Sequence, residues 1–482
     1  MNSQVDNSAA ENIQRILNKQ RNAYIAGGAV SAETRIDRLT RAIDLIFDNR
    51  DEIVATLSED FGHRSSHQSL MSDIYATIEC LKHSKKHLKK WMKHEKRKAP
   101  FPMNLLGGKA RVEYQPVGVV GIIGTWNFPI NTIFSPLAGV LAAGNRAMIK
   151  CSEVTPKTGE LVEKLVAKYF KEDELVAING GPDVGASFSA APFDHIIFTG
   201  ATSIARHIMR AAADNLTPVT LELGGKSPVI ISDSYALQEA AERIVNGKIL
   251  NVGQVCLSPD YVFVPEAKLE DFISAVMDHL GSLFPSLLDN ADYTSVVNGR
   301  HFQRLQSYLA DAREQGADVR EFNPANENFD QQEGTHKLPL TVIVNPSDEL
   351  KVMQEELFGP ILCVKSYRKL DDCLDYINAR PRPLALYYFG KDDAEQRRIL
   401  DHSISGAVTI NDVIFHVSCE GLPFGGIGPS GMGNYHGVDG FRTFSHAKAV
   451  YKQSNLNFQK LGGMLPPYGD KADKTLNAMI RK

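Results

Sequence analysis

The sequence lacks an apolar run of the length that a membrane span requires, about 18 residues. The first residues, MNSQVDNSAAENIQR, contain no apolar segment behind a basic start, so they do not resemble a secretory signal. The formal net charge of the 482 residues is −4, which does not favour nucleic acid or an anionic surface as a partner. We therefore expect a cytoplasmic protein that neither spans a membrane nor binds nucleic acid.

Cysteine is sparse and scattered. No two cysteines form a C-x-x-C pair, which argues against a structural zinc site and a disulfide framework. Free thiols in a reducing compartment are the simplest interpretation, and we expect no metal site. The six cysteines are Cys80, Cys151, Cys256, Cys363, Cys373 and Cys419.

The full G-x-G-x-x-G fingerprint of dinucleotide-binding proteins is also absent, but the pattern of a nucleotide-binding fold is present. The apolar spacing predicts helices over residues 10–60 and Met71–His94. The basic run Lys82–Lys98 is best explained as the solvated face of the second helix, and a nucleic-acid or membrane patch is the alternative. From residue 117, buried-type strands alternate with helices up to about residue 225. This alternation predicts a doubly wound parallel sheet, which binds ligands at the carboxyl ends of its strands.

A second α/β region follows from about Lys226, and it leads into the glycine-rich loop LPFGGIGPSGMG at 422–433. The stretch TFSHAKAVYKQS after this loop alternates apolar and polar residues and predicts an extended arm. An arm beyond the last domain pairs most simply with a second subunit, so we expect a homodimer.

Polar residues follow several of the predicted strands of the first region. Lys150 ends one strand and Glu153 follows it, a combination that suits the hydroxyls of a ribose but also describes a loop ion pair. Gly200 ends another strand, and Thr202 or Ser203 is expected to cap the next helix, whose free amides would attract phosphate. An ordinary turn between strand and helix explains the second pattern equally well.

Three further residues suggest reaction chemistry. In LNVGQVCLSPD, Cys256 follows a glycine and precedes a proline, as in a bend that presents a thiol, although a lone cysteine is more often a core residue. Glu222 lies between leucines, where burial would raise its pKa towards that of a general base, unless backbone amides satisfy it. Asn127 follows a strand and offers an amide donor for an oxyanion, or simply forms a turn. Together they predict attack on a carbonyl and hydride loss to a nicotinamide.

Five motifs, GTWNFPI, LELGGKSP, GQVCLSP, EELFGP and LPFGGIGPSGMG, resemble the aldehyde dehydrogenase superfamily in order and spacing. The resemblance runs from about residue 15 to the end. The stretch from NDVIFHVSCEGLPF to FRTFSHAKAV is similar to the class 3 branch, and within it to coniferyl-aldehyde dehydrogenases.

The resemblance implies a catalytic role for three residues: Cys256 as nucleophile, Asn127 with the Cys256 N–H as oxyanion hole, and Glu222 as the base that activates water. It implies NAD as cofactor, with NADP as the alternative, and Phe424 as an aromatic neighbour of the nicotinamide. The implied cofactor-binding residues are Thr125, Trp126, Lys150, Glu153, Gly181, Gly200, Ala201, Thr202, Leu223, Glu356 and Phe358.

The resemblance also implies an α/β fold with a Rossmann-like NAD-binding domain (1–93 and 113–224), a catalytic domain (225–424) and a β oligomerisation arm (94–112 and 434–455). Three departures from the family pattern concern cofactor binding: Ala201 lacks a usual serine hydroxyl, Ala205 stands where a glycine is expected, and Cys151 replaces a frequent proline.

The expected reaction is oxidation of an apolar or aromatic aldehyde, such as coniferaldehyde, to the acid. The alternatives are a medium- or long-chain aliphatic substrate, a coenzyme A-acylating dehydrogenase, against which Glu222 argues, and an inactive homologue. Apolar side chains near the predicted site favour an apolar or aromatic substrate, unless they belong to the core: Phe128, Val255, Leu257, Phe415 and Phe424.

Overall fold

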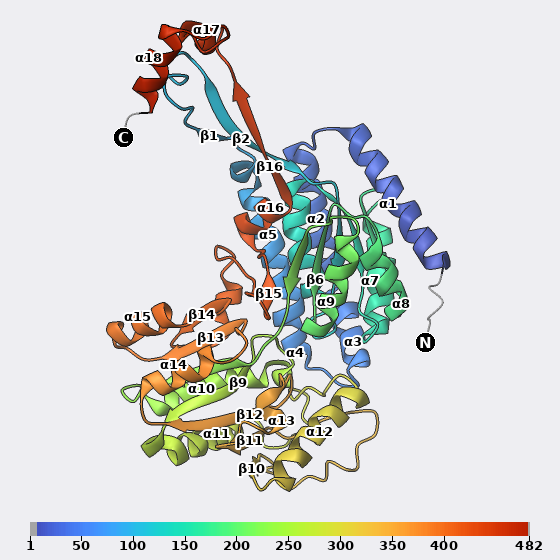
Figure 1. Cartoon of the computed structure of the whole chain (residues 1–482). Coiled ribbons are helices and arrows are strands. Elements are labelled where there is room, and N and C mark those ends of the chain that lie inside the picture. The colour runs from blue at the N-terminus through green and yellow to red at the C-terminus, as the bar shows by residue number, and fades with distance from the viewer. Residues whose placement is uncertain (1–6, 481–482) are drawn as a thin grey trace.

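The computed structural model describes residues 7–480, so the first six residues of the predicted first domain lie outside the described part. Two β-sheets with their helices form the body, and a three-stranded sheet projects from it as an arm (Figure 1). Across residues 7–480, no helix has both the length and the apolar character needed to cross a bilayer.

The first sheet has six strands in the order β15-β7-β6-β3-β4-β5. Its apolar strands are parallel, except that β15 runs antiparallel to β7. The chain winds from β3 outward to β5 and then returns to place β6 beside β3, so the carboxyl ends of β3 and β6 flank the point where ligands bind in such sheets. The strands are β3 (Val119–Ile123), β4 (Arg146–Lys150), β5 (Leu175–Ile178), β6 (His195–Thr199), β7 (Val219–Glu222) and β15 (Gly431–Met432).

Helices cover both faces of this sheet. Residues of α1, α8 and α9 pack on one face, and residues of α2, α5, α6 and α7 pack on the other. The helices are α1 (Asn7–Gly27), α2 (Ala32–Asp48), α3 (Arg50–Asp60), α4 (Ser66–Ser69), the π-helical turn η1 (Leu70–Tyr75), α5 (Ala76–Trp91), α6 (Asn131–Ala143), α7 (Pro156–Tyr169), α8 (Pro182–Ala190), α9 (Thr202–Ala213) and α16 (Gly437–Thr443).

The helical stretch predicted for residues 10–60 is three helices. It breaks where Gly28 adopts a positive φ of 61° and Ser31 caps α2 by accepting a hydrogen bond from the Thr34 amide. On α5, Leu81 and Leu88 are buried and Trp91 packs against the same core, as expected if the basic residues of this helix form its solvated face.

The second sheet has seven strands in the order β10-β11-β12-β9-β8-β13-β14, parallel except for β10. The strands are β8 (Ser227–Ile231), β9 (Pro259–Pro265), β10 (Asp318–Glu321), β11 (Thr341–Val344), β12 (Ile361–Tyr367), β13 (Ala385–Phe389) and β14 (Ala407–Ile410). Its helices are α10 (Leu237–Ile249), η2 (Leu250–Gly253), η3 (Glu266–Lys268), α11 (Leu269–Leu283), α12 (Gly299–Glu314), α13 (Lys351–Gln354), α14 (Leu370–Asn378), α15 (Asp393–His402) and η4 (Phe415–Ser418).

The arm joins segments from distant parts of the chain. β16 (Ser445–Lys452) pairs antiparallel with β2 (Lys109–Pro116), which also pairs with β1 (Glu95–Arg97). The short helices α17 (Phe458–Leu461) and α18 (Asp470–Met479) lie at its outer end (Figure 1). The tail predicted to be extended is thus a strand of this arm.

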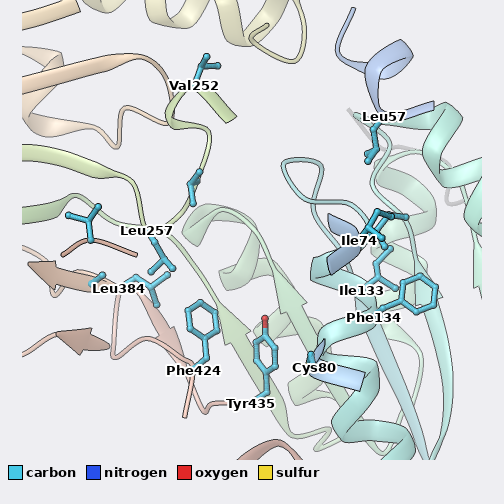
Figure 2. Close-up of a cluster of buried hydrophobic side chains, with 14 of the residues drawn as sticks. Leu57, Ile74, Cys80, Ile133, Phe134, Val252, Leu257, Leu384, Phe424 and Tyr435 are labelled. Carbon is cyan, nitrogen blue, oxygen red and sulfur yellow. The ribbon is translucent and has the colours of Figure 1, made fainter. Parts of the chain in front are cut away.

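One hydrophobic cluster contains residues from both sheets, so the body is packed as one unit. Figure 2 shows Ile133 and Phe134 of α6 on one side and Leu257 and Leu384, near the second sheet, on the other. Phe424 of the glycine-rich loop belongs to the same cluster. This packing brings the loops at the carboxyl ends of the first sheet against the turn that carries Cys256.

Candidate active site

A cavity of about 1460 Å³ lies between the two sheets, and all three predicted catalytic residues border it: Cys256, Glu222 and Asn127. Predicted cofactor residues also line it, namely Thr125, Trp126, Gly200, Ala201, Leu223, Glu356 and Phe358. The loops that follow β3, β6 and β7 therefore converge on the thiol, as expected for strands whose carboxyl ends meet at one edge.

The bend before Cys256 is tighter than the sequence suggested. Asn251 and Val252 have positive φ values of 47° and 45°, which non-glycine residues rarely adopt, and Gly253 follows at 77°. A Cβ at Gly253 would lie 2.3 Å from the carbonyl oxygen of Gly359, so only glycine fits at this point. The chain then enters β9 at Pro259, which fixes the thiol between a strained turn and a buried strand.

Burial sets the resting state of the thiol. Together with the nearby carboxylates of Glu356 and Glu222, it raises the pKa of Cys256 to about 12, although the main-chain amides of Cys256 and Leu257 lower this pKa. These amides therefore point towards the sulfur, where they are placed to bind negative charge on sulfur or on an adjacent oxygen. Forming the thiolate requires a group that accepts its proton.

Glu222 is 2% exposed, and neither carboxylate oxygen has a hydrogen-bond partner among the described residues. The alternative interpretation, a carboxylate satisfied by backbone amides, is therefore wrong. Burial raises the pKa of Glu222 well above its usual value. Such a carboxyl holds a proton readily and has free lone pairs for a water molecule, the properties of a general base.

Asn127 is 2% exposed and is fixed by its surroundings. Its Nδ2 donates to the carbonyl oxygen of Gln254 at 3.0 Å, which links it to the turn before Cys256. The main-chain carbonyl oxygen of Asn127 accepts from Asn251 Nδ2 at 3.1 Å and from Arg64 Nη1 at 3.0 Å. Nδ2 has a second hydrogen, which remains to be donated to an oxyanion.

A buried ion pair that sequence reasoning missed lies directly behind Asn127. Arg64 and Asp73 have fully buried side chains, and Nη2 lies 2.7 Å from Oδ2. Asp73 Oδ1 accepts from the backbone amides of Ile130 and Asn131, at the start of α6, at 3.1 and 3.2 Å. One ion pair thus holds both ends of the segment that carries Asn127. Nothing in the sequence around Arg64 or Asp73 indicates that these two residues form a pair.

The junction between β6 and α9 differs from the prediction in one respect. The N-cap of α9 is Ala201, which has no polar side chain, and Thr202 instead donates to the carbonyl oxygen of Pro429 at 3.1 Å. The expected cap by Thr202 or Ser203 is therefore wrong, because the helix begins at Thr202 itself. The consequence is an N-terminus whose first amides receive no side-chain cap and remain open to a phosphate.

Other features here also fit a dinucleotide. Thr199 Oγ1 is buried and has no hydrogen-bond partner within residues 7–480, and a Cβ at Gly224 would lie 2.2 Å from the Glu356 carboxylate. Glu356 Oε1 accepts from the Gly225 amide at 3.0 Å, and burial raises the pKa of Glu356 to about 7. Trp126 and Phe358 stand edge to face with ring centroids 5.3 Å apart.

Four predicted cofactor residues do not line this cavity: Lys150, Glu153, Gly181 and Thr202. Lys150 is buried at the end of β4, where its Nζ donates to the carbonyl oxygen of Cys151 at 2.6 Å and lies 3.5 Å from Glu153 Oε2. Gly181 is the N-cap of α8. Lys150 ends β4, Glu153 follows β4 and Gly181 follows β5, so these three residues lie at the same carboxyl edge of the sheet as the cavity, beyond its border.

Every side chain predicted to favour an apolar substrate lines the cavity: Phe128, Val255, Leu257, Phe415 and Phe424. Leu257 and Phe424 also belong to the core, so the two interpretations of these residues are compatible. Among residues 7–480, no group of three or more His, Cys, Asp or Glu side chains is arranged to hold a metal ion.

Comparison with known proteins agrees with this geometry. Residues 2–450 match the aldehyde dehydrogenase family. The chain belongs to this family. It is 53% identical over 468 residues to the probable coniferyl aldehyde dehydrogenase of Caulobacter vibrioides, covering 97% of this chain and 96% of that protein. It is 50% identical over 471 residues to the coniferyl aldehyde dehydrogenase of Pseudomonas sp. strain HR199, covering 98% and 97%.

A solved structure supports the same assignment for the fold of this aldehyde dehydrogenase. Staphylococcus aureus AldH in its substrate-bound state superposes with a TM-score of 0.90 at 32% sequence identity, over 97% of this chain and 99% of that one. The similarity includes both sheets and the arm, because it covers nearly the whole of each chain.

Proposed function

We propose that this aldehyde dehydrogenase oxidises an aromatic aldehyde of the coniferaldehyde type to the carboxylic acid, with NAD+ as cofactor and NADP+ as an alternative. The observation that carries the proposal is one cavity in which a thiol, a buried carboxylate without a partner and an amide donor meet an apolar wall. The names of the relatives support the aromatic substrate class.

In the proposed reaction, Sγ of Cys256 loses its proton and attacks the aldehyde carbon. Asn127 Nδ2 and the main-chain N–H of Cys256 donate hydrogen bonds to the resulting oxyanion. NAD(P)+, when bound, supplies the acceptor for the hydride that leaves this carbon. Glu222 then takes a proton from water, which attacks the cysteine thioester and releases the acid. The unpaired oxygens of Glu222 support this role, and they argue against coenzyme A as the acceptor of the acyl group.

The proposed cofactor site extends from the cavity along the carboxyl edge of the first sheet. Trp126, Thr125, Leu223 and Phe358 would surround the nicotinamide, with Glu356 on its ribose and Phe424 nearby. The uncapped start of α9, with Gly200, Ala201 and Thr202, would receive the pyrophosphate. Lys150 and Glu153 would bind the adenine ribose, with Gly181 close by.

We propose the domain division given above, with 94–112 and 434–455 as an oligomerisation arm, and a cytoplasmic homodimer. Large apolar side chains on and near the arm support the dimer, including Phe101 and Leu105, each 72% exposed, and Tyr468, 69% exposed. Light scattering of the full chain at micromolar concentration should give the mass of two chains, and a monomer would contradict this.

The decisive test of the function is an assay of the purified chain with coniferaldehyde, benzaldehyde and a medium-chain alkanal, with each cofactor, following NAD(P)H absorbance and acid formation. Aromatic aldehydes should give the higher kcat/KM. Cys256→Ala should abolish hydride transfer, while Cys419→Ser, an exposed cysteine outside the proposed mechanism, should retain it. No activity with any aldehyde would mean an inactive homologue, and a preference for alkanals would favour the aliphatic alternative.

A further inference from the structure

A second group of polar side chains borders the cavity beside α5. Glu420 Oε2 and His436 Nδ1 are enclosed and lack a hydrogen-bond partner among residues 7–480, and His436 is only 6% exposed. The thiol of Cys80 lies within hydrogen-bond reach of the Glu420 carboxyl and also of the main-chain carbonyl oxygen of Ser135, 3.6 Å from Sγ, so its one hydrogen can serve only one of them at a time. Buried polar atoms without partners are unfavourable, so both groups are suited to a polar atom of a ligand.

Two aromatic rings separate this group from the reactive thiol. Figure 2 shows Phe424 and Tyr435 between Leu257, the neighbour of the thiol in the chain, and Cys80, the neighbour of the carboxyl. The two ring centroids are 5.5 Å apart in an edge-to-face arrangement. The Tyr435 hydroxyl interacts electrostatically with the carboxylate and thiol of the reaction site and also with Glu420. The cavity wall thus has the reaction centre at one end, aromatic rings along it and a carboxyl at the other end.

His436 is held in place at this end by an unusual backbone conformation. Its φ is 94°, in a region that side chains other than glycine rarely adopt. The conformation places its imidazole nearly parallel to the Phe424 ring, with centroids 5.2 Å apart and an interplanar angle of 22°. Burial lowers the pKa of His436 to about 3, so the ring is neutral and Nδ1 accepts or donates a hydrogen bond according to its tautomer.

We propose that Glu420, assisted by His436, binds the phenolic hydroxyl of a 4-hydroxy aromatic aldehyde and thereby selects phenolic substrates. In such a molecule the hydroxyl and the aldehyde lie at opposite ends of a flat, conjugated body. This body matches a wall of aromatic rings with polar groups at both ends. An alkanal or an unsubstituted ring would leave the carboxyl and the imidazole unpaired, and sites built around a hydroxyl discriminate strongly against ligands that lack one. The inference rests on the proposed aldehyde oxidation.

The test compares three aldehydes that differ only on the ring: 4-hydroxy-3-methoxycinnamaldehyde, its 4-O-methyl ether and cinnamaldehyde. Burial raises the pKa of Glu420 to about 7, so the assay is run at pH 8, where the carboxyl is ionised. For the wild-type chain, kcat/KM for the phenol should then exceed that for the ether by roughly 10- to 100-fold, the range of a hydrogen bond to a charged group. Glu420→Leu should reduce this ratio to about one, by lowering kcat/KM for the phenol while cinnamaldehyde is oxidised as well as before or better. Glu420→Gln, which keeps the shape and an acceptor oxygen, should give an intermediate ratio.

Glu314→Gln is the matched control, because it removes one carboxylate from an exposed position on α12 and should leave the ratio unchanged. A wild-type ratio near one, or a ratio that persists in Glu420→Leu while cinnamaldehyde is still oxidised, would overturn the inference and leave the aldehyde oxidation intact. Inactivity of the wild type towards all three aldehydes would overturn both. Retained oxidation of cinnamaldehyde by a Glu420 variant shows that it is folded.

Discussion

The pair Arg64–Asp73 offers a sharp test of how the oxyanion donor is positioned. In Asp73→Asn the side chain keeps its size, and its carbonyl oxygen can still accept from the amides of Ile130 and Asn131. The variant lacks the negative charge that faces the fully buried guanidinium of Arg64, so this positive charge is left unpaired. An unpaired charge of this kind costs about 3–5 kcal/mol of unfolding free energy. Glu266→Gln removes a carboxylate from an exposed pair with Arg368 and should leave the free energy of unfolding almost unchanged, because solvent screens such a pair.

Asp73→Asn should also lower kcat. Arg64 donates to the main-chain carbonyl oxygen of Asn127 and so holds the backbone from which the Asn127 side chain projects. A displacement of about 1 Å in a catalytic group can reduce the rate ~100-fold, so we expect a loss of roughly 10- to 100-fold in kcat with little change in KM for the cofactor. The assay is steady-state oxidation at a temperature where melting curves show the variant to be folded.

A double-mutant cycle separates positioning from general destabilisation. Asn127→Ala alone should lower kcat by about 10²- to 10³-fold, the cost of removing one oxyanion donor. If Asp73 acts through Asn127, then adding Asp73→Asn should lower kcat by less than about threefold more, because the group it positions is already absent. Losses that multiply would refute the reasoning and assign the ion pair a purely structural role.

Three further predictions follow from the site and the core. Glu222→Gln should release a burst of NADH near one equivalent per site and then turn over about 10²- to 10⁴-fold more slowly, as rapid-mixing absorbance would show, and the absence of a burst would mean that the carboxylate is needed before the thioester forms. Glu153→Gln should raise kcat/KM for NADP+ relative to NAD+ by about fivefold, since a charge that would repel a 2′-phosphate is removed, and an unchanged ratio in parallel assays would contradict this. Burial lowers the pKa of His195 to about 4. The buried neutral histidine therefore contributes its full stabilisation above its unfolded pKa of about 6.5. This stabilisation, about 3 kcal/mol of unfolding free energy, is lost as the pH falls from there through 4. His195→Gln should flatten the pH dependence of urea unfolding over this interval, and an unchanged slope would show that the histidine is already charged in the folded state.

The sequence predicted the parts of the site that follow strands, because a residue's position after a buried strand determines the edge of the sheet at which it lies. Glu222 and Asn127 were found in this way, whereas Cys256, which precedes β9, was found from the glycine and proline of its bend; all three border one cavity. β8 (Ser227–Ile231) was missed, since only four residues separate it from β7, which is too few for the helix that marks off the other strands. The alternation of strands and helices was nevertheless sufficient to predict two α/β units.

Contacts between distant segments could not be predicted. Arg64 meets the Asn127 loop 63 residues away, and nothing in the residues around either position indicates the other. The enclosed position of Glu420 Oε2 is likewise a property of the packing against α5, and only the folded chain shows that among residues 7–480 this oxygen has no hydrogen-bond partner at normal geometry. The start of α9 shows a local failure: Thr202 suited an N-cap by type, but the helix includes it and its hydroxyl bonds to Pro429.

The first sheet is not complete until nearly the whole chain has been synthesised. Its edge strand β15 comes from residues 431–432, α16 packs on α6, and Asn145 Nδ2 donates to the carbonyl oxygen of Phe444 at 2.8 Å. During translation, therefore, the half of the protein that emerges first must wait with an unpaired edge while the second sheet is made. We therefore expect the two halves to fold together, and a fragment that ends before β15 to lack part of the first sheet.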